Sequence, residues 1–358
     1  MLPRDRVLVT LNGVIPDRVP IFARFTEPLI EIFREKTGKN DPEEYYGTDM
    51  RLLAFRSSEH IHDFSEYYAS EEIPKEAILN EWGTYYVPSS LSSVHGIYKM
   101  FHPMKDLDSQ EDIATYPFPD MMAPCRHEGL EDEVESLHKK GLAVIGWVGT
   151  IFEQAWYLRG MENLLMDFSL NPDFAAALLD RITEIRQAMA ARWVKVGVDI
   201  VRTADDVGGQ EAMIMNPATW RRWLKPRLAK VIESARNIHS EIPVAYHSDG
   251  NIEAIIPDLI EIGVTVLEPV QPECMDPAEI KRQYGDKLTL LGTIGAQTTL
   301  ALGTPDDVKR EVKERMDTVG REGGLILAPS SSNWFEADVP WENIEAFFEA
   351  VQVYGVYR

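Results

Sequence analysis

The sequence predicts an α/β protein built as a single (β/α)8 barrel, in which parallel strands alternate with helices. Short apolar runs alternate with stretches of helical periodicity, which is the order expected of a parallel sheet with crossover helices. Four of the last five predicted strands are followed by a loop and a helix signal, as in repeated βα units. The length of 358 residues fits one such barrel with insertions.

The predicted strands and the helices after them have separate local signals. Asparagine, aspartate or threonine stands before the later helices, often with proline just inside the start, which is typical of a helix N-terminus. The strands are expected at residues 19–24, 142–149, 199–204, 244–247, 265–269, 288–292 and 324–328, and the later helices at 218–239, 251–262, 276–284 and 308–319.

The N-terminal part, residues 1–140, is less regular. A helix is expected at 27–37, a hairpin from 82–87 and 96–101, and a proline-rich crossing loop at 115–124. The stretch 164–197 is expected to be one long helix or two, with Asn171-Pro172-Asp173 as the break in the second case, because proline interrupts a helix interior. No linker separates these parts, so residues 1–358 are predicted to form one domain, with an N-terminal elaboration before the regular βα units of 141–358.

The composition excludes several classes of function. The net charge is −22 and no run of Lys and Arg is present, so neither nucleic acid nor an anionic membrane is an expected partner. No segment approaches the ~20 apolar residues that span a bilayer, and charges within the first turn argue against a signal peptide. The two cysteines match no metal or redox spacing, which favours a reducing compartment, the cytoplasm.

Polar clusters follow the predicted strands, where the active site of such a barrel is built. Asp205 and Asp206 follow the strand at 199–204 and precede a glycine pair, so they are candidate catalytic carboxylates. The alternative is a turn whose aspartates cap the next helix. His247 and Asp249 end the strand at 244–247, and such a pair can bind zinc or relay a proton. The alternative is that His247 packs at the barrel mouth and Asp249 only caps.

Other strand ends carry candidate substrate-binding residues. The loops after the strands offer carboxylate, amide and hydroxyl groups, each of which is equally a candidate for a turn or rim contact. These residues are Glu153, Glu268, Gln271, Gln297, Ser331 and Asn333.

Taken together, these clusters and several further motifs resemble the uroporphyrinogen decarboxylase superfamily, which also holds the corrinoid-dependent methyltransferases. The motifs keep their order along almost the whole chain. They are Arg4-Asp5-Arg6-Val7, Pro16-Asp17-Arg18-Val19-Pro20, Tyr116-Pro117-Phe118-Pro119-Asp120, Leu158-Arg159-Gly160, Asp205-Asp206, His247-Ser248-Asp249-Gly250, Gly303-Thr304-Pro305, residues 323–328 and Glu342-Asn343-Ile344. The resemblance implies a distorted (β/α)8 barrel and a homodimer.

The resemblance implies two enzyme functions. True decarboxylases carry an N-terminal arginine-rich motif that binds the carboxylates of the porphyrinogen, whereas the matching stretch here has one arginine, Arg24. The methyltransferases hold zinc through a His-x-Cys pair and a later Cys. His247 matches that histidine, Asp249 replaces the first cysteine, and the serines at 330–332 stand where the last cysteine would be. A set completed by Glu153 or Asp206 would suit an ether or an amine rather than a thiol.

The favoured hypothesis is a methyltransferase that moves a methyl group from a small methylated ether or amine to a corrinoid on a separate protein. Zinc at His247 and Asp249 would assist, and no cofactor is expected to be bound covalently. Two alternatives stay open. One is a decarboxylase acting on a porphyrinogen or a smaller carboxylic acid, and the other is a barrel that binds a small molecule without catalysis.

Overall fold

The centre of the protein is a curled parallel β-sheet, seen in a computed structural model that describes residues 1–58, 60–88, 97–331, 334–336 and 338–357. Seven strands pair in the order β11-β10-β9-β8-β7-β6-β2, and the pairs between neighbours are parallel. They are β2 (Met50–Leu53), β6 (Ala143–Thr150), β7 (Ile200–Ala204), β8 (Val244–His247), β9 (Val266–Glu268), β10 (Thr289–Leu291) and β11 (Leu325–Ile326). The predicted parallel α/β sheet is therefore confirmed.

The segment at residues 20–22 lies between the two edge strands of this sheet. The Phe22 amide donates to the Leu327 carbonyl at 3.0 Å, and the Asp49 amide donates to the Ile21 carbonyl at 2.9 Å. The sequence predicted a full strand at 19–24, but the pairing there is limited to a bridge between Ile21 and Leu327 and to Arg24, which pairs with Trp334. The prolines at 16 and 20 leave fewer backbone donors for a ladder, which accounts for the short pairing.

The interior of the curled sheet is filled by one cluster of buried side chains, which come from the strands, from the segments at both sheet edges and from helix α1 (Pro3–Leu11). Phe22, Met50 and Ile326 meet there, although they lie far apart along the chain. The cluster also contains Val7, Ala143, Ile145, Ile200, Ala245, Val266, Leu291 and Ala328. Side chains from both edges of the sheet can share one core only because the sheet curls around it.

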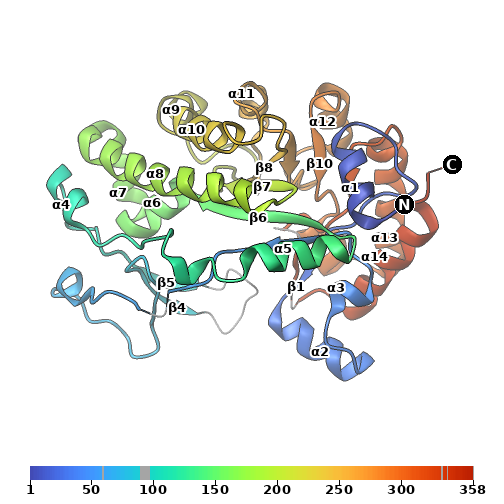
Figure 1. Cartoon of the computed structure of the whole chain (residues 1–358), viewed down its shortest axis with the longest axis horizontal. Coiled ribbons are helices and arrows are strands. Elements are labelled where there is room, and N and C mark those ends of the chain that lie inside the picture. Colours follow the sequence, from blue (N-terminus) through green and yellow to red (C-terminus); the bar gives the residue numbers. More distant parts are fainter. Residues whose placement is uncertain (59, 89–96, 332–333, 337, 358) are drawn as a thin grey trace.

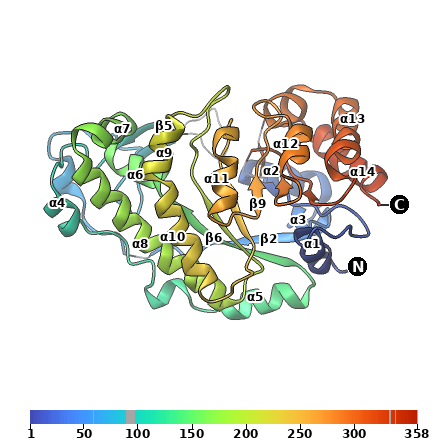
Figure 2. The same ribbon diagram turned by 90° about the horizontal axis from the view of Figure 1, so that it is seen from above.

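Helices cover the outside of the sheet (Figure 1). Helices α8 and α10 pack side by side, as Figure 2 shows from above. Of the two alternatives for residues 164–197, the structure has two helices, because α7 ends at Leu170 and α8 begins at Pro172. The covering helices are α6 (Phe152–Arg159), α7 (Met161–Leu170), α8 (Pro172–Val196), α9 (Pro217–Trp223), α10 (Lys225–Arg236), α11 (Ile256–Glu261), α12 (Pro277–Tyr284), α13 (Pro305–Arg315) and α14 (Trp341–Tyr354). None of the helices in the described ranges is long and apolar enough to cross a membrane.

The N-terminal part adds elements outside the parallel sheet. Its antiparallel sheet, in the order β3-β4-β5, contains the predicted hairpin, although Gly96 lies outside the described residues. The strand β2 was not predicted. The added elements are α1 (Pro3–Leu11), β1 (Arg24–Phe25), α2 (Glu27–Thr37), α3 (Pro42–Tyr45), β3 (Ile78–Leu79), β4 (Tyr85–Pro88), β5 (Ile97–Phe101), α4 (Gln110–Thr115) and α5 (Leu130–Lys139). Strand β1 pairs with β12 (Trp334–Phe335) in a separate two-stranded sheet.

Ion pairs lie at the amino end of the parallel strands, just before β2 begins. Asp49 is fully buried, and its carboxylate contacts Arg6 at 2.6 Å and Arg18 at 2.8 Å. Arg6 in α1 also binds Asp17 at 2.7 Å. The motifs at 4–7 and 16–20 therefore build the end of the sheet opposite to the strand-end clusters. Both chain termini lie near this region, as Figures 1 and 2 agree.

Candidate functional site

Three neighbouring strands bring the predicted residues together at the carboxyl end of the sheet. In the register of the sheet, Ala204 of β7 stands beside His247 of β8, and His247 stands beside Glu268 of β9. Asp205 and Asp206 come directly after β7, and Asp249 lies two residues beyond the end of β8. Parallel strands end at the same edge, so a short stretch after each strand reaches one place.

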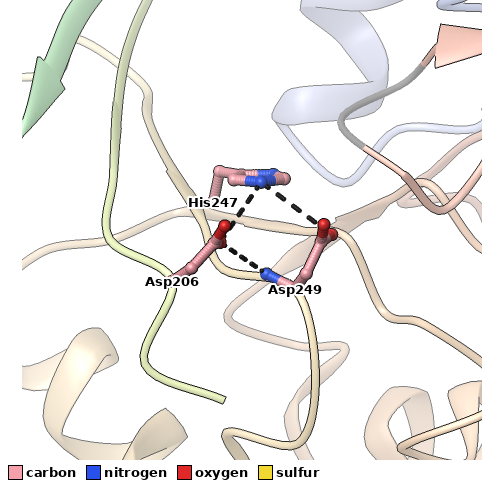
Figure 3. Close-up of side chains that lie close together, drawn as sticks. All are labelled: Asp206, His247 and Asp249. Atoms are coloured by element: carbon pink, nitrogen blue, oxygen red, sulfur yellow. Dashed lines mark hydrogen bonds and ion pairs between the residues drawn. The ribbon is translucent and has the colours of Figure 1, made fainter. Parts of the chain in front are cut away.

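His247, Asp206 and Asp249 form the candidate site (Figure 3). The Nε2 atom of His247 lies 3.6 Å from an Asp206 oxygen and 3.8 Å from an Asp249 oxygen. The Asp249 backbone amide donates to Asp206 Oδ1 at 3.0 Å, which holds the two carboxylates in place. The structure therefore brings the imidazole of His247 close to Asp206 and Asp249, as the sequence predicted.

The surroundings of the site raise the pKa of both His247 and Asp249. Burial alone would lower the pKa of the His247 imidazole, but Asp249, Glu268 and Asp206 outweigh it and the net shift is upward. Enclosure raises the pKa of Asp249 to about 7, and the nearby charge of Asp206 adds to this while His247 opposes it. About a third of the Asp249 side chain, 34%, still reaches solvent. The site is therefore sheltered but open to a ligand.

Asp205 faces away from this cluster and holds the start of α6. Its carboxylate accepts hydrogen bonds from the backbone amides of Ile151 at 2.9 Å and Glu153 at 3.0 Å. Burial raises the pKa of Asp205 to about 8, because the desolvation outweighs these amides. These contacts hold Asp205 at the start of α6, a helix that precedes it in the chain, and not at the next helix, which the sequence alternative had named.

Glu153 lies close to the site on the first turn of α6. The Tyr157 hydroxyl one turn later donates to its carboxylate. Burial raises the pKa of Glu153, and the negative charge of Asp206 raises it further. Glu153 therefore carries a proton more readily than an ordinary glutamate does.

Glu268 is fully buried beneath His247 and is bound by an arginine that the sequence analysis missed. Arg202 Nε lies 2.9 and 2.8 Å from the two Glu268 oxygens, and its Nη2 lies 2.5 Å from Oε1. The guanidinium also stacks 4.8 Å from the Trp147 ring centroid. One signal could have revealed Arg202, because a charge inside an apolar five-residue strand is rarely buried without a partner.

A cavity of about 420 Å³ opens beside Asp249. Among its lining residues are three of the predicted substrate-binding residues, Gln271, Gln297 and Ser331. Gln271 accepts the Gly250 amide at 3.1 Å, and Ser331 donates to Glu336 at 2.7 Å. The remaining prediction in this loop, Asn333, lies outside the described residues, as does Ser332.

Arg24, the remaining predicted substrate-binding residue, lies close enough to Arg202 to feel its charge. It is not among the residues that line the cavity. Its guanidinium stacks 3.8 Å from the ring centroid of Trp334, a residue that the sequence analysis did not single out. Burial lowers the pKa of Arg24 to about 10, and the neighbouring charge of Arg202 contributes. Stacking on a ring face leaves the charge of Arg24 in place, whereas the charge of Arg202 is paired with Glu268.

The donor atoms fit a divalent cation. One ligand atom from each of Asp206, His247 and Asp249 lies within 4.8 Å of the others. The Asp249 Oδ1 atom is buried and has no hydrogen-bond partner among the described residues. One imidazole with two carboxylates is a donor set used for zinc and for harder divalent metals.

Comparisons with known proteins place the chain in a family. Residues 103–354 match the family model for uroporphyrinogen decarboxylase (URO-D). A methylcobamide:CoM methyltransferase from Methanosarcina barkeri (strain Fusaro) is 30% identical over 98% of both chains. A second one from M. barkeri is 33% identical over 51% of this chain and 50% of its own length. The maize chloroplastic uroporphyrinogen decarboxylase is 23% identical over 60% of this chain and 53% of its own.

The fold is shared with a solved structure. A methyltransferase from Methanosarcina mazei has a TM-score of 0.67 and 20% identity, and the match covers 99% of both chains. At that identity the likeness concerns the fold. The family model covers most of the chain, and one relative aligns from end to end. This chain therefore belongs to the uroporphyrinogen decarboxylase family and is nearer to its corrinoid-dependent methyltransferases than to its true decarboxylases.

Proposed function

We propose that this protein is a methyltransferase that moves a methyl group from a small methylated ether or amine to a corrinoid carried by a separate protein. The observation that carries the proposal is the meeting of His247, Asp206 and Asp249 at the carboxyl end of the sheet, beside a cavity. The similarity to methylcobamide:CoM methyltransferases supports methyl transfer that involves a corrinoid.

The proposal includes a complete barrel. The segment at residues 20–22 hydrogen-bonds to both edge regions of the sheet and would be the eighth position of a distorted (β/α)8 barrel. Buried side chains from residues before and after 140 belong to one hydrophobic cluster. This shared core supports a single domain over residues 1–358, with the N-terminal part as an elaboration.

His247 Nε2 and the carboxylates of Asp206 and Asp249 would hold the metal. When bound, it would supply a Lewis acid that polarises the heteroatom carrying the methyl group. The cavity would bind the substrate, with Gln271 and Gln297 orienting it by hydrogen bonds. The transfer breaks the bond between carbon and the heteroatom, and that heteroatom then needs a proton. Glu153 is suited to hold this proton, since its raised pKa favours the protonated carboxyl.

The donor set favours an oxygen or nitrogen substrate over a thiol. Thiolate ligands are soft and suit sites that activate thiols, whereas two carboxylates make a harder site. Asp249 lines the cavity where the substrate would lie, and Asp206 lies on the same side of the His247 ring. We therefore propose an ether or an amine as the methyl donor.

Metal content tests the metal-assisted part of this proposal. We expect the purified protein to retain zinc or another divalent ion, and His247→Ala and Asp249→Ala to retain far less. A matched control is His138→Ala, which removes a histidine bound to Asp199 at 2.9 Å near the amino end of β7. Equal, near-zero metal in wild type and in both site variants would remove the metal role.

Turnover tests the reaction class. We expect methylation of a cob(I)alamin acceptor in the presence of methylated ethers or amines, and loss of that activity in His247→Ala but not in His138→Ala. Release of CO2 from uroporphyrinogen would instead establish the decarboxylase alternative. A bound small molecule that shows no turnover with any acceptor would favour the non-catalytic alternative.

A further inference from the structure

Three inward-facing side chains lie beneath the candidate metal site. Paired residues of neighbouring strands point to the same face of a sheet, and so do residues two apart on one strand. Arg202 lies two residues before Ala204, Ala204 stands beside His247, and His247 stands beside Glu268. Trp147 of β6 stands beside Arg202. The register alone therefore brings Trp147, Arg202, His247 and Glu268 to the interior of the curled sheet.

The Arg202–Glu268 pair is almost fully buried. The exposed fractions of the two side chains are 5% and 0%. The guanidinium contacts both carboxylate oxygens, and the Trp147 ring covers the guanidinium. A planar guanidinium held in this way has little freedom to rotate, so it fixes the plane of the carboxylate.

His247 bridges this pair and the two aspartates. Its Nδ1 atom lies 3.5 Å from Glu268 Oε1, while its Nε2 atom faces Asp206 and Asp249 on the other side of the ring. An ionised carboxylate only accepts hydrogen bonds, so it favours a proton on the nitrogen that faces it. Asp206 and Asp249 favour a proton on Nε2 by the same rule, but they are partly exposed, whereas Glu268 is fully buried and lies slightly closer to its nitrogen. Water screens a buried charge less, so the pull of Glu268 is the stronger one, and in a neutral imidazole Nε2 then keeps its lone pair.

We propose that Glu268, locked by Arg202, is a positioning residue that holds His247 in the Nδ1–H tautomer with Nε2 directed at the ligand position between Asp206 and Asp249. This role rests on the proposed function, because the direction of Nε2 matters only if a ligand binds between the aspartates. It also gives Glu268 a different role from the substrate contact that the sequence suggested, since no part of its side chain reaches solvent.

The tautomer can be measured without any metal. We would record long-range ¹H–¹⁵N spectra of metal-free, ¹⁵N-histidine-labelled protein at alkaline pH, where imidazoles are neutral. The signal of residue 247, among 8 histidines, is assigned as the one that His247→Gln lacks. We expect the Nδ1–H pattern in wild type and a shift toward Nε2–H or a mixture in Glu268→Gln. An Nε2–H pattern in wild type, or an unchanged Nδ1–H pattern in Glu268→Gln, would overturn the proposal.

A matched control separates positioning from the general loss of a buried ion pair. Glu311→Gln breaks another buried ion pair, in which Arg315 contacts Glu311 at 2.7 Å. Both residues belong to the outer helix α13 and not to the strands that carry His247 and Glu268. We expect this variant to leave the tautomer of His247 unchanged. If Glu268→Gln does not fold, Glu268→Asp serves instead, because it keeps the charge for Arg202 but withdraws the carboxylate from Nδ1.

Metal affinity gives the second measurement. Competition with a chelator is expected to show affinity about 10- to 100-fold lower in Glu268→Gln, the range typical of residues that orient a metal-binding histidine, with no change in Glu311→Gln. A tautomer shift in a protein that binds no metal would leave the positioning role standing while the metal-assisted function fails. Equal affinity in wild type and Glu268→Gln, with metal bound, would overturn the positioning role alone.

Discussion

At the scale of single residues, the candidate site depends on how the His247 imidazole interacts with three carboxylates. The two carboxylates at 206 and 249 lie on one side of the His247 ring, and the buried carboxylate at 268 lies on the other. Each negative charge favours the protonated imidazole, which explains the upward shift of the His247 pKa despite burial. A bound cation would replace that proton, so we expect metal binding to weaken as pH falls.

Asp206→Asn separates the charge of this residue from its structural contact. An asparagine Oδ1 still accepts the amide of Asp249, so the loop geometry is retained while one negative charge is lost. We expect the affinity for a divalent metal to fall about tenfold or more, because affinity depends on the number of charged ligands. Titration calorimetry on the metal-free protein measures this. Unchanged affinity would exclude Asp206 from the ligand set.

At the scale of elements, two loops interlock to place the site residues. Gly208 and Gly209 in the loop after β7 contact Gly250 in the loop after β8, and Gly209 bridges to Asn251. Gly250 has a φ of 81°, and a Cβ there would lie 2.6 Å from the Gly208 carbonyl carbon. Side chains larger than hydrogen would therefore push the two loops apart.

Gly250→Ala tests this contact. Its matched control is Gly197→Ala, because Gly197 also has a positive φ, 95°, but no atom within 4 Å of a Cβ. Both variants pay a similar backbone strain, about 1–2 kcal/mol, while only Gly250→Ala displaces Asp249. We expect methyl transfer to fall about 100-fold in Gly250→Ala and to stay near wild type in Gly197→Ala, since a displacement near 1 Å has effects of that size. Equal rates in the two variants would contradict the loop argument.

At the scale of the whole molecule, buried ion pairs and the candidate site lie at opposite ends of the parallel strands. The ion pairs of Arg6, Arg18, Asp17 and Asp49 lie where the strands begin, and the candidate site lies where they end. Such barrels show the same division in general. Changes at the amino end should therefore alter folding without altering the site.

Asp17→Asn tests this division through its pH dependence. A hydrogen bond from Arg6 holds the pKa of Asp17 well below its ordinary value, so the charged form stabilises the fold above about pH 4 and that contribution is lost as pH falls further. The asparagine variant lacks this titration. We expect it to be less stable by about 0.5–1 kcal/mol at pH 7, given that the side chain is partly exposed, and the difference to shrink toward pH 2.

Chemical denaturation over a pH series, with wild type and variant compared at each pH, measures this difference. Metal affinity at neutral pH is expected to be the same in both proteins. A difference in stability that is constant from pH 7 to pH 2 would show that the Asp17 charge does not stabilise the fold. A change in metal affinity would show that the two ends of the sheet are coupled.

The sequence by itself determined the features that depend on neighbours in the chain. Aliphatic runs predicted the strands β6 to β10, and cap residues such as Asp276 and Thr304 predicted where helices begin. The close spacing of His247 and Asp249 was sufficient to place both at one strand end. These are local effects of side-chain periodicity and backbone capping, which a linear sequence carries in full.

Only the tertiary structure decided which distant groups meet. Arg202 and Glu268 are 66 residues apart, and their pairing follows from the register of three strands rather than from any local pattern. Asp205 and Asp206 are adjacent in sequence, yet one caps α6 and the other faces His247. Short strands such as β2 have too few residues for a periodic signal. In each case the arrangement is decided by contacts between segments that come together only when the sheet curls.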